Sequence, residues 1–262
     1  MIDSLQCDIS QASGYHSLTQ IARVISECWC SQNLYCASCS AEALEQAPAN
    51  TRALDFRCRK CWETYQVKSQ KKLNLRRIVD GAYSAMLSAV QQNSAPNLVI
   101  LNYSSTWTIQ NLVLVPSLFL TESVIERRNP LSAKAERVGW IGCNLILSNV
   151  PADGKIPLVE NAVVVPAGTV RAAYQRYKKL ASVDSALRGW TFDVLSVARQ
   201  LGNEFTLDQM YAHEAGLASL HPQNQNIRPK IRQQLQVLRD LSVLRFLGDG
   251  KYQFLKAPHS GA

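Results

Sequence analysis

The sequence lacks the features of a secreted or membrane-inserted chain. The opening segment, Met1 to Asp8, carries neither a basic stretch nor an apolar one, although a signal peptide needs both. No apolar run approaches the roughly 20 residues that cross a bilayer. The sequence therefore predicts a cytoplasmic protein with no membrane partner.

Several common catalytic motifs are also missing. The sequence has no glycine-rich phosphate loop and no nucleophile elbow. Its four histidines, at positions 16, 213, 221 and 259, show no spacing typical of metal ligands. These absences leave the cysteines and the charged residues as the main candidates for chemistry.

The length and charge of the chain set broad limits. Its 262 residues suit two domains or one large one, and 47% hydrophobic residues allow a real core. The basic residues behind the net charge of +8 are concentrated in two segments of the chain. Residues 57–77 hold eight basic side chains against one acidic, and residues 228–256 hold seven against two. Two basic patches favour a polyanion bound at two places, and two ordinary solvated faces are the alternative.

Four of the eight cysteines stand in two C-x2-C pairs. Cys36 and Cys39 form the first pair, and Cys58 and Cys61 follow after eighteen residues. This spacing is typical of a tetrahedral zinc site, because each pair turns two thiolates toward one ion and leaves no open position. We predict a structural zinc, with disulfides or unrelated buried thiols as the alternatives. The remaining cysteines are interpreted as buried or incidental: Cys7, Cys28, Cys30 and Cys143.

A polar trio surrounds the second cysteine pair. Residues 62–68 have the aromatic and β-branched character of a strand, so the pair should form the tip of a hairpin. Gln66 and Lys68 share one face of that strand, and the hairpin can bring Asp55 across from them. Metal-assisted phosphodiester cleavage needs such a set: two oxygen ligands for a divalent cation and a lysine that orients water and offsets developing charge. A solvated polar strand is the alternative.

The apolar periodicity of the first part of the chain predicts an α/β domain. We expect helices at 17–29, 78–90, 122–128 and 169–180, buried strands at 98–101 and 112–115, a loop at 40–53, and a tight turn or strand end at 139–143. Together they form a mixed central sheet flanked by helices, with the zinc-stabilised hairpin attached. The pattern lapses at 181–188, so we place this domain at residues 1–183.

Residues 184–262 predict a winged-helix domain. A helix at 192–201 ends at Gly202, a capping box at 206–209 opens a second helix, and Asn226 caps a third. Two alternating segments around 248–250 then form a hairpin, with Lys251 in the wing.

The third helix of this domain is amphipathic. Its apolar positions are Ile227, Ile231, Leu235 and Leu238. Its polar positions can reach phosphates and base edges in a major groove: Arg228, Lys230, Arg232, Gln233 and Gln236. A winged helix that mediates only protein contacts is the alternative.

Several stretches occur together in one known family: the two cysteine pairs, Asp55-Phe56, Lys68-Ser69, 80–83, 139–144 and 230–240. On these residues the chain, over nearly its whole length, resembles the methyl-directed restriction endonucleases of the DpnI type. The resemblance implies a nuclease domain of the PD-(D/E)xK type with a structural zinc, and a C-terminal winged helix. It also implies magnesium-dependent cleavage of duplex DNA at GATC when the adenine is N6-methylated.

The resemblance also implies roles for individual residues. It places Asp55, Gln66 and Lys68 on the catalytic trio, with Asp55 and Gln66 on magnesium. It places Trp140 on the aromatic residue that lies against the methyl groups of the DNA, and a core tryptophan is the alternative. Gln66 departs from the family pattern, which has glutamate, so an amide dipole stands where a carboxylate charge is expected. Manganese should be able to substitute for magnesium.

Three functions are therefore considered. The first is a methylation-dependent type II restriction endonuclease, whose partner is double-stranded DNA and which needs no protein partner. The second is a protein that binds methylated GATC with weak or no cleavage, which Gln66 favours. The third is a zinc-stabilised winged-helix transcription regulator.

Overall fold

The computed structural model describes residues 2–48, 51 and 54–255. Lys256 of the second basic patch and positions 49, 50, 52 and 53 of the expected loop lie outside the described residues. The chain divides by its contacts into two compact units. The first comprises 1–74, 95–117 and 155–175, and the second comprises 75–94, 118–154 and 176–262.

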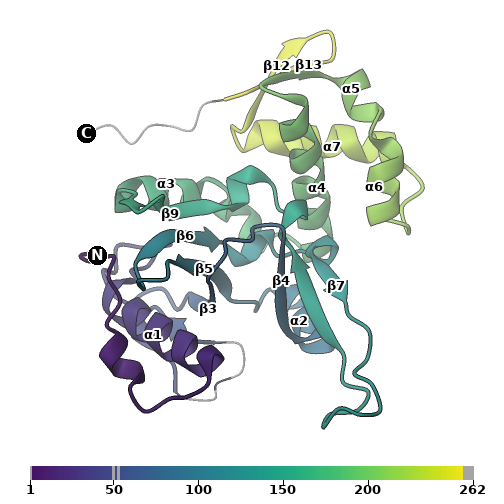
Figure 1. Ribbon diagram of the computed structural model, residues 1–262. Helices are drawn as coiled ribbons and strands as arrows, with labels where there is room; N and C mark the ends of the chain where they lie inside the picture. The colour runs from purple at the N-terminus through teal and green to yellow at the C-terminus, as the bar shows by residue number, and fades with distance from the viewer. Residues whose placement is uncertain (1, 49–50, 52–53, 256–262) are drawn as a thin grey trace. The chain divides into compact units, whose positions relative to one another are not determined.

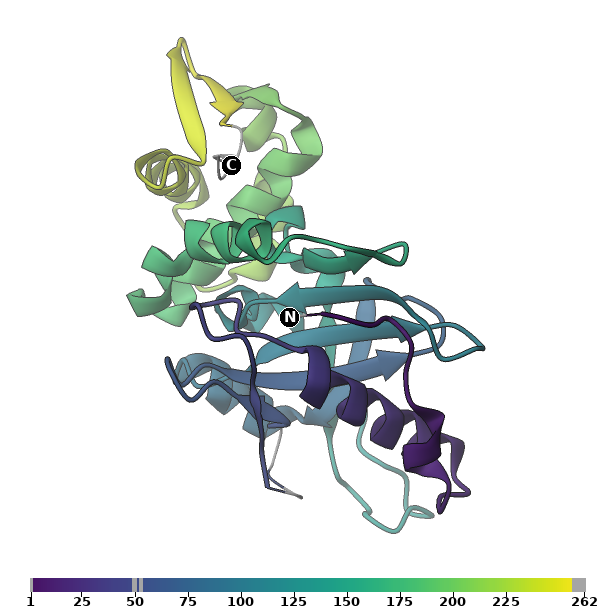
Figure 2. The ribbon, with the colours of Figure 1, turned by 90° about the vertical axis from the view of Figure 1, so that its left-hand side faces the viewer.

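The first unit is built on a mixed seven-stranded sheet (Figures 1 and 2). Its strands, in spatial order, are β1 (Glu45–Gln46), β2 (Phe56–Arg57), β3 (Thr64–Gln70), β5 (Asn97–Tyr103), β6 (Ile109–Val115), β9 (Ile156–Glu160) and β10 (Val163–Val164). Strands β3 and β5 are parallel, and the other neighbours are antiparallel. The predicted buried strands at 98–101 and 112–115 are thus confirmed as the centres of β5 and β6.

Two α-helices cover this sheet. A short 3-10 helix, η1 (Ile9–Ala12), precedes the first of them in the chain. Helix α1 (Leu18–Asn33) lies against the strands (Figure 2) and buries Ile25, Trp29 and Cys30. Helix α3 (Ala167–Arg176) buries Val170 and Tyr174 in the same core cluster. The expected helix at 17–29 is confirmed with a later end, and the one at 169–180 starts earlier and finishes in a 3-10 turn, η6 (Lys178–Ser182).

The second unit contains a small antiparallel sheet and helix α2 (Tyr83–Gln91). The sheet has the order β4 (Arg77–Ala82), β8 (Gly142–Ile146), β7 (Ile125–Arg127). The prediction of one helix over 78–90 was wrong in its first part, because residues 77–82 pair with β8. Side chains of β4 alternate between buried and exposed, so Ile78 and Asp80 face inward with the period of a strand. The expected helix at 122–128 is also wrong in its second half, since a single 3-10 turn, η3 (Glu122–Val124), leads directly into β7.

Three further 3-10 turns occur in loops of the second unit or at its borders: η2 (Ser117–Phe119), η4 (Leu147–Asn149) and η5 (Ala152–Gly154). Gly139 has a left-handed φ of +74°, as expected for a tight turn before β8.

The C-terminal part of the second unit has the element order of a winged helix. It comprises α4 (Ser185–Leu201), β11 (Glu204–Thr206), α5 (Leu207–Tyr211), α6 (Glu214–Leu220), α7 (Ile227–Asp240), β12 (Leu244–Gly248) and β13 (Lys251–Phe254). Strands β11, β13 and β12 form a three-stranded sheet. The capping box at Thr206 and Gln209 is confirmed, and all four predicted apolar positions of α7 are buried. Asn226 does precede α7, but its side chain makes no capping hydrogen bond.

The division at 183/184 remains a prediction, because contacts group the chain differently. Residues 75–94 and 118–154 belong with the C-terminal helices. Two hydrogen bonds of buried side chains on α4 contribute to this grouping: Arg188 donates to Asn93 Oδ1 at 2.7 Å, and Asp193 Oδ1 accepts from Ser123 at 2.9 Å. Within the described residues, no helix is both long and apolar enough to cross a membrane.

Candidate functional site

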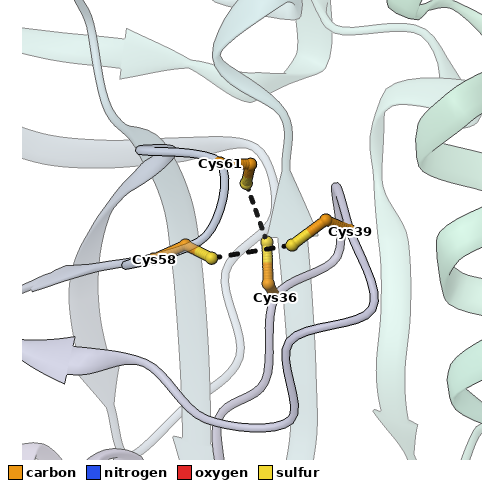
Figure 3. Close-up of side chains that lie close together, drawn as sticks. All are labelled: Cys36, Cys39, Cys58 and Cys61. Carbon is orange, nitrogen blue, oxygen red and sulfur yellow. Dashed lines mark hydrogen bonds between the residues drawn. The ribbon is translucent and has the colours of Figure 1, made fainter.

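The four predicted cysteine ligands converge at the tip of the β2–β3 hairpin (Figure 3). All four sulfur atoms lie within 4.8 Å of one another, and the Cys36–Cys61 and Cys39–Cys58 sulfurs are 3.5 and 3.6 Å apart. A tetrahedral ion with metal–sulfur bonds of about 2.3 Å separates its ligands by about 3.8 Å. The cluster can therefore hold a metal ion such as zinc with little adjustment.

Local backbone structure turns each cysteine pair toward this point. In the second pair, Cys58 N–H donates to the Glu63 carbonyl and Trp62 N–H donates to the Cys58 carbonyl, which closes a tight turn. Trp62 has a left-handed φ of +65°. Backbone N–H groups of Lys60 and Ala41 lie 3.4 and 3.5 Å from the sulfurs of Cys58 and Cys39. Such N–H groups stabilise thiolates, which are the form that binds metal.

Buried partners hold the first pair in place. The Tyr65 hydroxyl accepts the Ala37 N–H at 3.2 Å and lies 3.3 Å from Cys36 Sγ. Arg171 of α3 donates to the carbonyls of Cys36 and Ala41. The two thiols of this pair differ in pKa. Burial raises the pKa of Cys36. At Cys39 the effect of burial is smaller than the combined effect of the Ala41 N–H and the neighbouring thiols, which lower the pKa of Cys39 to about 7.

Asp55, Gln66 and Lys68 line one cavity of about 650 Å³. Asp55 precedes β2, and Gln66 and Lys68 lie on β3, so the hairpin brings the trio together as the sequence suggested. Asp55 Oδ2 accepts the N–H of Val67 at 2.7 Å, which fixes the carboxylate against β3. Gln66 is only 8% exposed. An acid, an amide oxygen and a lysine thus face a common space, an arrangement that could hold a divalent cation.

Two charged residues of this cavity lie outside the predicted trio. Arg23 and Glu27 of α1 also line it, and Arg23 Nε lies 2.7 Å from Glu27 Oε1. Glu27 falls inside the helix predicted at 17–29, which gave it no role in a site. The i,i+4 spacing of an arginine and a glutamate is visible in the sequence, but it is common on helix surfaces. It therefore does not by itself indicate that α1 contributes to the cavity of the hairpin.

Trp140 lies in the second unit and lines a separate cavity of about 460 Å³ with Tyr83 and Arg127. Its side chain is half-buried, and the guanidinium of Arg137 lies 5.2 Å from the centre of its ring. Gly142 leaves room for the indole, because an added Cβ there would approach Trp140 Cζ3 to 2.8 Å. The indole is therefore partly accessible and does not belong to the fully buried core.

The predicted DNA-contacting side chains of α7 lie mainly on its exposed face. Arg228, Arg232, Gln233 and Gln236 are exposed, as is Lys251 on the wing, whereas Lys230 is half-buried. Neighbouring groups hold two of the arginines: Arg228 pairs with Glu214 at 2.8 Å, and Arg232 donates to the Tyr211 hydroxyl at 2.6 Å. Helix α7 thus presents amides and guanidinium groups, which hydrogen-bond to bases and phosphates.

Family models match both parts of the chain. The model described as DpnI, Dam-replacing family, matches residues 4–183. The model described as DpnI_C, Dam-replacing HTH domain, matches residues 186–254. Together these matches cover nearly all of the sequence, which confirms the resemblance seen in its motifs.

Proposed function

Because the chain belongs to the Dam-replacing family of DpnI, we propose that it is a methylation-dependent type II restriction endonuclease. In this proposal it hydrolyses both strands of DNA at GATC when the adenine carries an N6-methyl group. The observation that carries the proposal is the shared cavity of Asp55, Gln66 and Lys68. Family membership implies restriction and DNA binding, and the cavity supplies a location for the hydrolytic step.

The oxygen donors of the cavity fit magnesium. Mg²⁺ usually keeps several waters and takes one or two carboxylates together with phosphate oxygens. Asp55 offers a carboxylate and Gln66 an amide oxygen on the wall of the same cavity. When bound, the cation polarises the phosphoryl group and acidifies water. Manganese accepts mixed ligands more readily and should be the better partner for an amide.

The side chains of the cavity then take distinct roles. Asp55, oriented by the Val67 N–H, binds the cation with a full charge, and Gln66 completes the set with a dipole. Lys68 orients the attacking water and offsets charge on the phosphate. The water oxygen bonds to phosphorus, the bond from phosphorus to the leaving ribose oxygen breaks, and that oxygen takes up a proton.

We propose that the cysteine cluster holds zinc with a structural role. Four thiolates complete the tetrahedral shell and leave no position for a substrate. The metal would fix the tip of the hairpin, which has Asp55 directly before β2 and Gln66 on β3. Its loss should therefore reduce folding and cleavage together, because metal affinity at such a site is folding free energy.

DNA recognition is assigned to two elements of the second unit. Helix α7 would lie in the major groove with Arg228, Lys230, Arg232, Gln233 and Gln236 toward phosphates and bases, while Lys251 of the wing contacts the backbone. The half-buried indole of Trp140 would cover the adenine methyl group. Covering a methyl group with an aromatic face excludes water and is worth on the order of 1 kcal/mol.

A second function is favoured by Gln66 alone. With one anionic ligand replaced by a neutral amide, the protein could bind methylated GATC without cutting it. The regulator hypothesis has less support, because a zinc-stabilised regulator needs neither the large α/β unit nor the cavity with Lys68.

Digestion of one plasmid tests the proposal. The plasmid is prepared from an adenine-methylating and a non-methylating host and is incubated with magnesium and with manganese. We expect fragments only from methylated DNA. Asp55→Ala and Lys68→Ala should abolish cutting yet retain methyl-specific binding, whereas Lys179→Ala, which removes an exposed lysine outside both basic patches, should cut normally.

One outcome would establish the second function instead. Wild-type protein that binds methylated GATC but never nicks it with either metal, while Gln66→Glu does cut, would mean that the natural protein is a binder.

A further inference from the structure

The cavity that carries the proposed chemistry contains one carboxylate more than the motif supplies. Glu27 lies on α1, about forty residues before the Gln-x-Lys motif in the chain, and lines the cavity together with Asp55 and Gln66. Two carboxylates and an amide oxygen thus face the space where a divalent cation is proposed.

The orientation of Glu27 differs from that of an ordinary surface residue. Its side chain is 19% exposed, while that of its partner Arg23 is 64% exposed. Helix α1 buries Ile25, Trp29 and Cys30 against the sheet, and Glu27 lies beside that face. The carboxylate is therefore largely shielded from solvent, whereas the guanidinium lies toward the open side.

Electrostatics also places both acids near the same face of α1. After burial and the neighbouring Cys7 thiol, the negative charges of Asp55 and Glu27 both contribute to the raised pKa of Cys30, one turn beyond Glu27. The charge of Asp55 also contributes, after Glu27, to the raised pKa of Arg23. Helix α1 and the hairpin thus bring the two carboxylates into one electrostatic environment.

We propose that Glu27 is a metal ligand of the catalytic site and replaces the anionic charge that Gln66 lacks. This inference rests on the proposed nuclease function. With Glu27, the cation meets two carboxylates and one neutral oxygen, and the negative charge on the ligands is the same as in a site with aspartate and glutamate on the hairpin. Hard cations are sensitive to this charge.

Arg23 has a defined part in this arrangement. Its guanidinium neutralises Glu27 in the metal-free protein through the 2.7 Å contact. A cation that binds Glu27 competes with that contact, so Arg23 lowers metal affinity and moves toward solvent, or toward a DNA phosphate, when the metal is present. The alternative is that Arg23 and Glu27 form only a helix-surface ion pair, which contributes about 0.3–0.5 kcal/mol to stability.

Binding of Mn²⁺ to the zinc-loaded protein without DNA, measured by electron paramagnetic resonance, tests the proposal independently of cleavage. Glu27→Gln should weaken Mn²⁺ binding about tenfold or more, since a ligand charge is lost. Gln66→Glu should strengthen it, and the double variant Glu27→Gln with Gln66→Glu should return close to wild type. Glu42→Gln removes the same charge from an exposed position of the same unit and should change nothing.

A second variant guards against a Glu27→Gln protein that fails to fold. Arg23→Gln, at an exposed side chain, should strengthen Mn²⁺ binding several-fold, because the cation no longer competes with the guanidinium. If Glu27 were only an ion-pair partner, neither variant would alter Mn²⁺ affinity, and the proposal would be overturned. Asp55→Asn distinguishes a failure of the proposed function from a failure of this inference. If Asp55→Asn also leaves Mn²⁺ binding unchanged, the proposed function loses its metal site. If only Asp55→Asn weakens Mn²⁺ binding, the role of Glu27 alone is refuted.

Discussion

Removing the hydroxyl of Tyr65 should affect the cysteine site more than its size suggests. Tyr65 is only 2% exposed and lies on β3 just before Gln66. Its hydroxyl accepts the Ala37 N–H at 3.2 Å and can donate to Cys36 Sγ at 3.3 Å. Tyr65→Phe preserves the buried ring but removes both hydrogen bonds. It therefore tests whether the hairpin and the sulfur cluster support each other.

The size of the effect follows from these two contacts. The buried Ala37 N–H loses this partner, which costs about 1–3 kcal/mol of unfolding free energy. Loss of a hydrogen bond that orients a ligand lowers metal affinity about 10- to 100-fold, or about 1.4–2.8 kcal/mol. We expect Tyr65→Phe to cost the metal-loaded protein about 2–6 kcal/mol in total, and the metal-free protein only the first part.

Two measurements separate these parts. Denaturant unfolding of the metal-loaded protein reports the total, and competition with a zinc chelator reports the affinity. Tyr174→Phe is the matched control, because Tyr174 is equally buried but its hydroxyl donates to an oxygen, Asn97 Oδ1, at 3.1 Å. That oxygen also accepts the Ser117 N–H, so this control should cost about 1 kcal/mol and leave zinc affinity unchanged.

The two variants should therefore differ in zinc affinity. Equal zinc affinities for Tyr65→Phe and Tyr174→Phe would show that the hydroxyl does not act on Cys36. Soluble and active protein without any zinc in elemental analysis would remove the metal centre altogether.

Three other predictions concern the second unit. Gly142→Ala should displace the Trp140 ring, because Cζ3 of that ring would lie 2.8 Å from the new Cβ. In a binding titration the preference for methylated over unmethylated duplex should fall about fivefold. An unchanged preference would show that Trp140 has only a structural role. The pKa of Asp153 is lowered because Arg199 and Tyr177 outweigh the effect of burial, so its contribution to stability is complete above the unfolded-state pKa of about 3.9 and is lost as pH falls through the lower folded value. Asp153→Asn should accordingly cost about 1.5–3 kcal/mol at pH 7 and flatten the acid limb of a stability profile against pH, and an unaltered acid limb would contradict this. Lys251→Ala should weaken binding to all DNA sequences and reduce the salt slope by about one, whereas Gln233→Ala should cost about 1–3 kcal/mol at methylated GATC only; a uniform loss for both variants would remove Gln233 from base recognition.

Local patterns in the sequence determined much of this protein. The two C-x2-C pairs predicted a cluster that the hairpin does form, because each pair needs only one tight turn to orient two thiolates. The apolar spacing of α7 correctly predicted its buried face, and the capping box correctly predicted the start of α5, because both patterns are local. In each case the pattern that led to the prediction lies within one turn or one helix, although the two cysteine pairs themselves meet across 19 and 25 positions of the chain.

Tertiary structure decided the features that depend on distant partners. Residues 77–82 have the apolar spacing of a helix, yet they form β4 because β8, more than sixty residues later, offers a strand to pair with. Glu27 joins the cavity of Asp55 and Gln66 only because α1 lies against the sheet beside the hairpin. Periodicity indicates which face of an element is buried, but the partner that covers this face is set by packing among segments far apart in the chain.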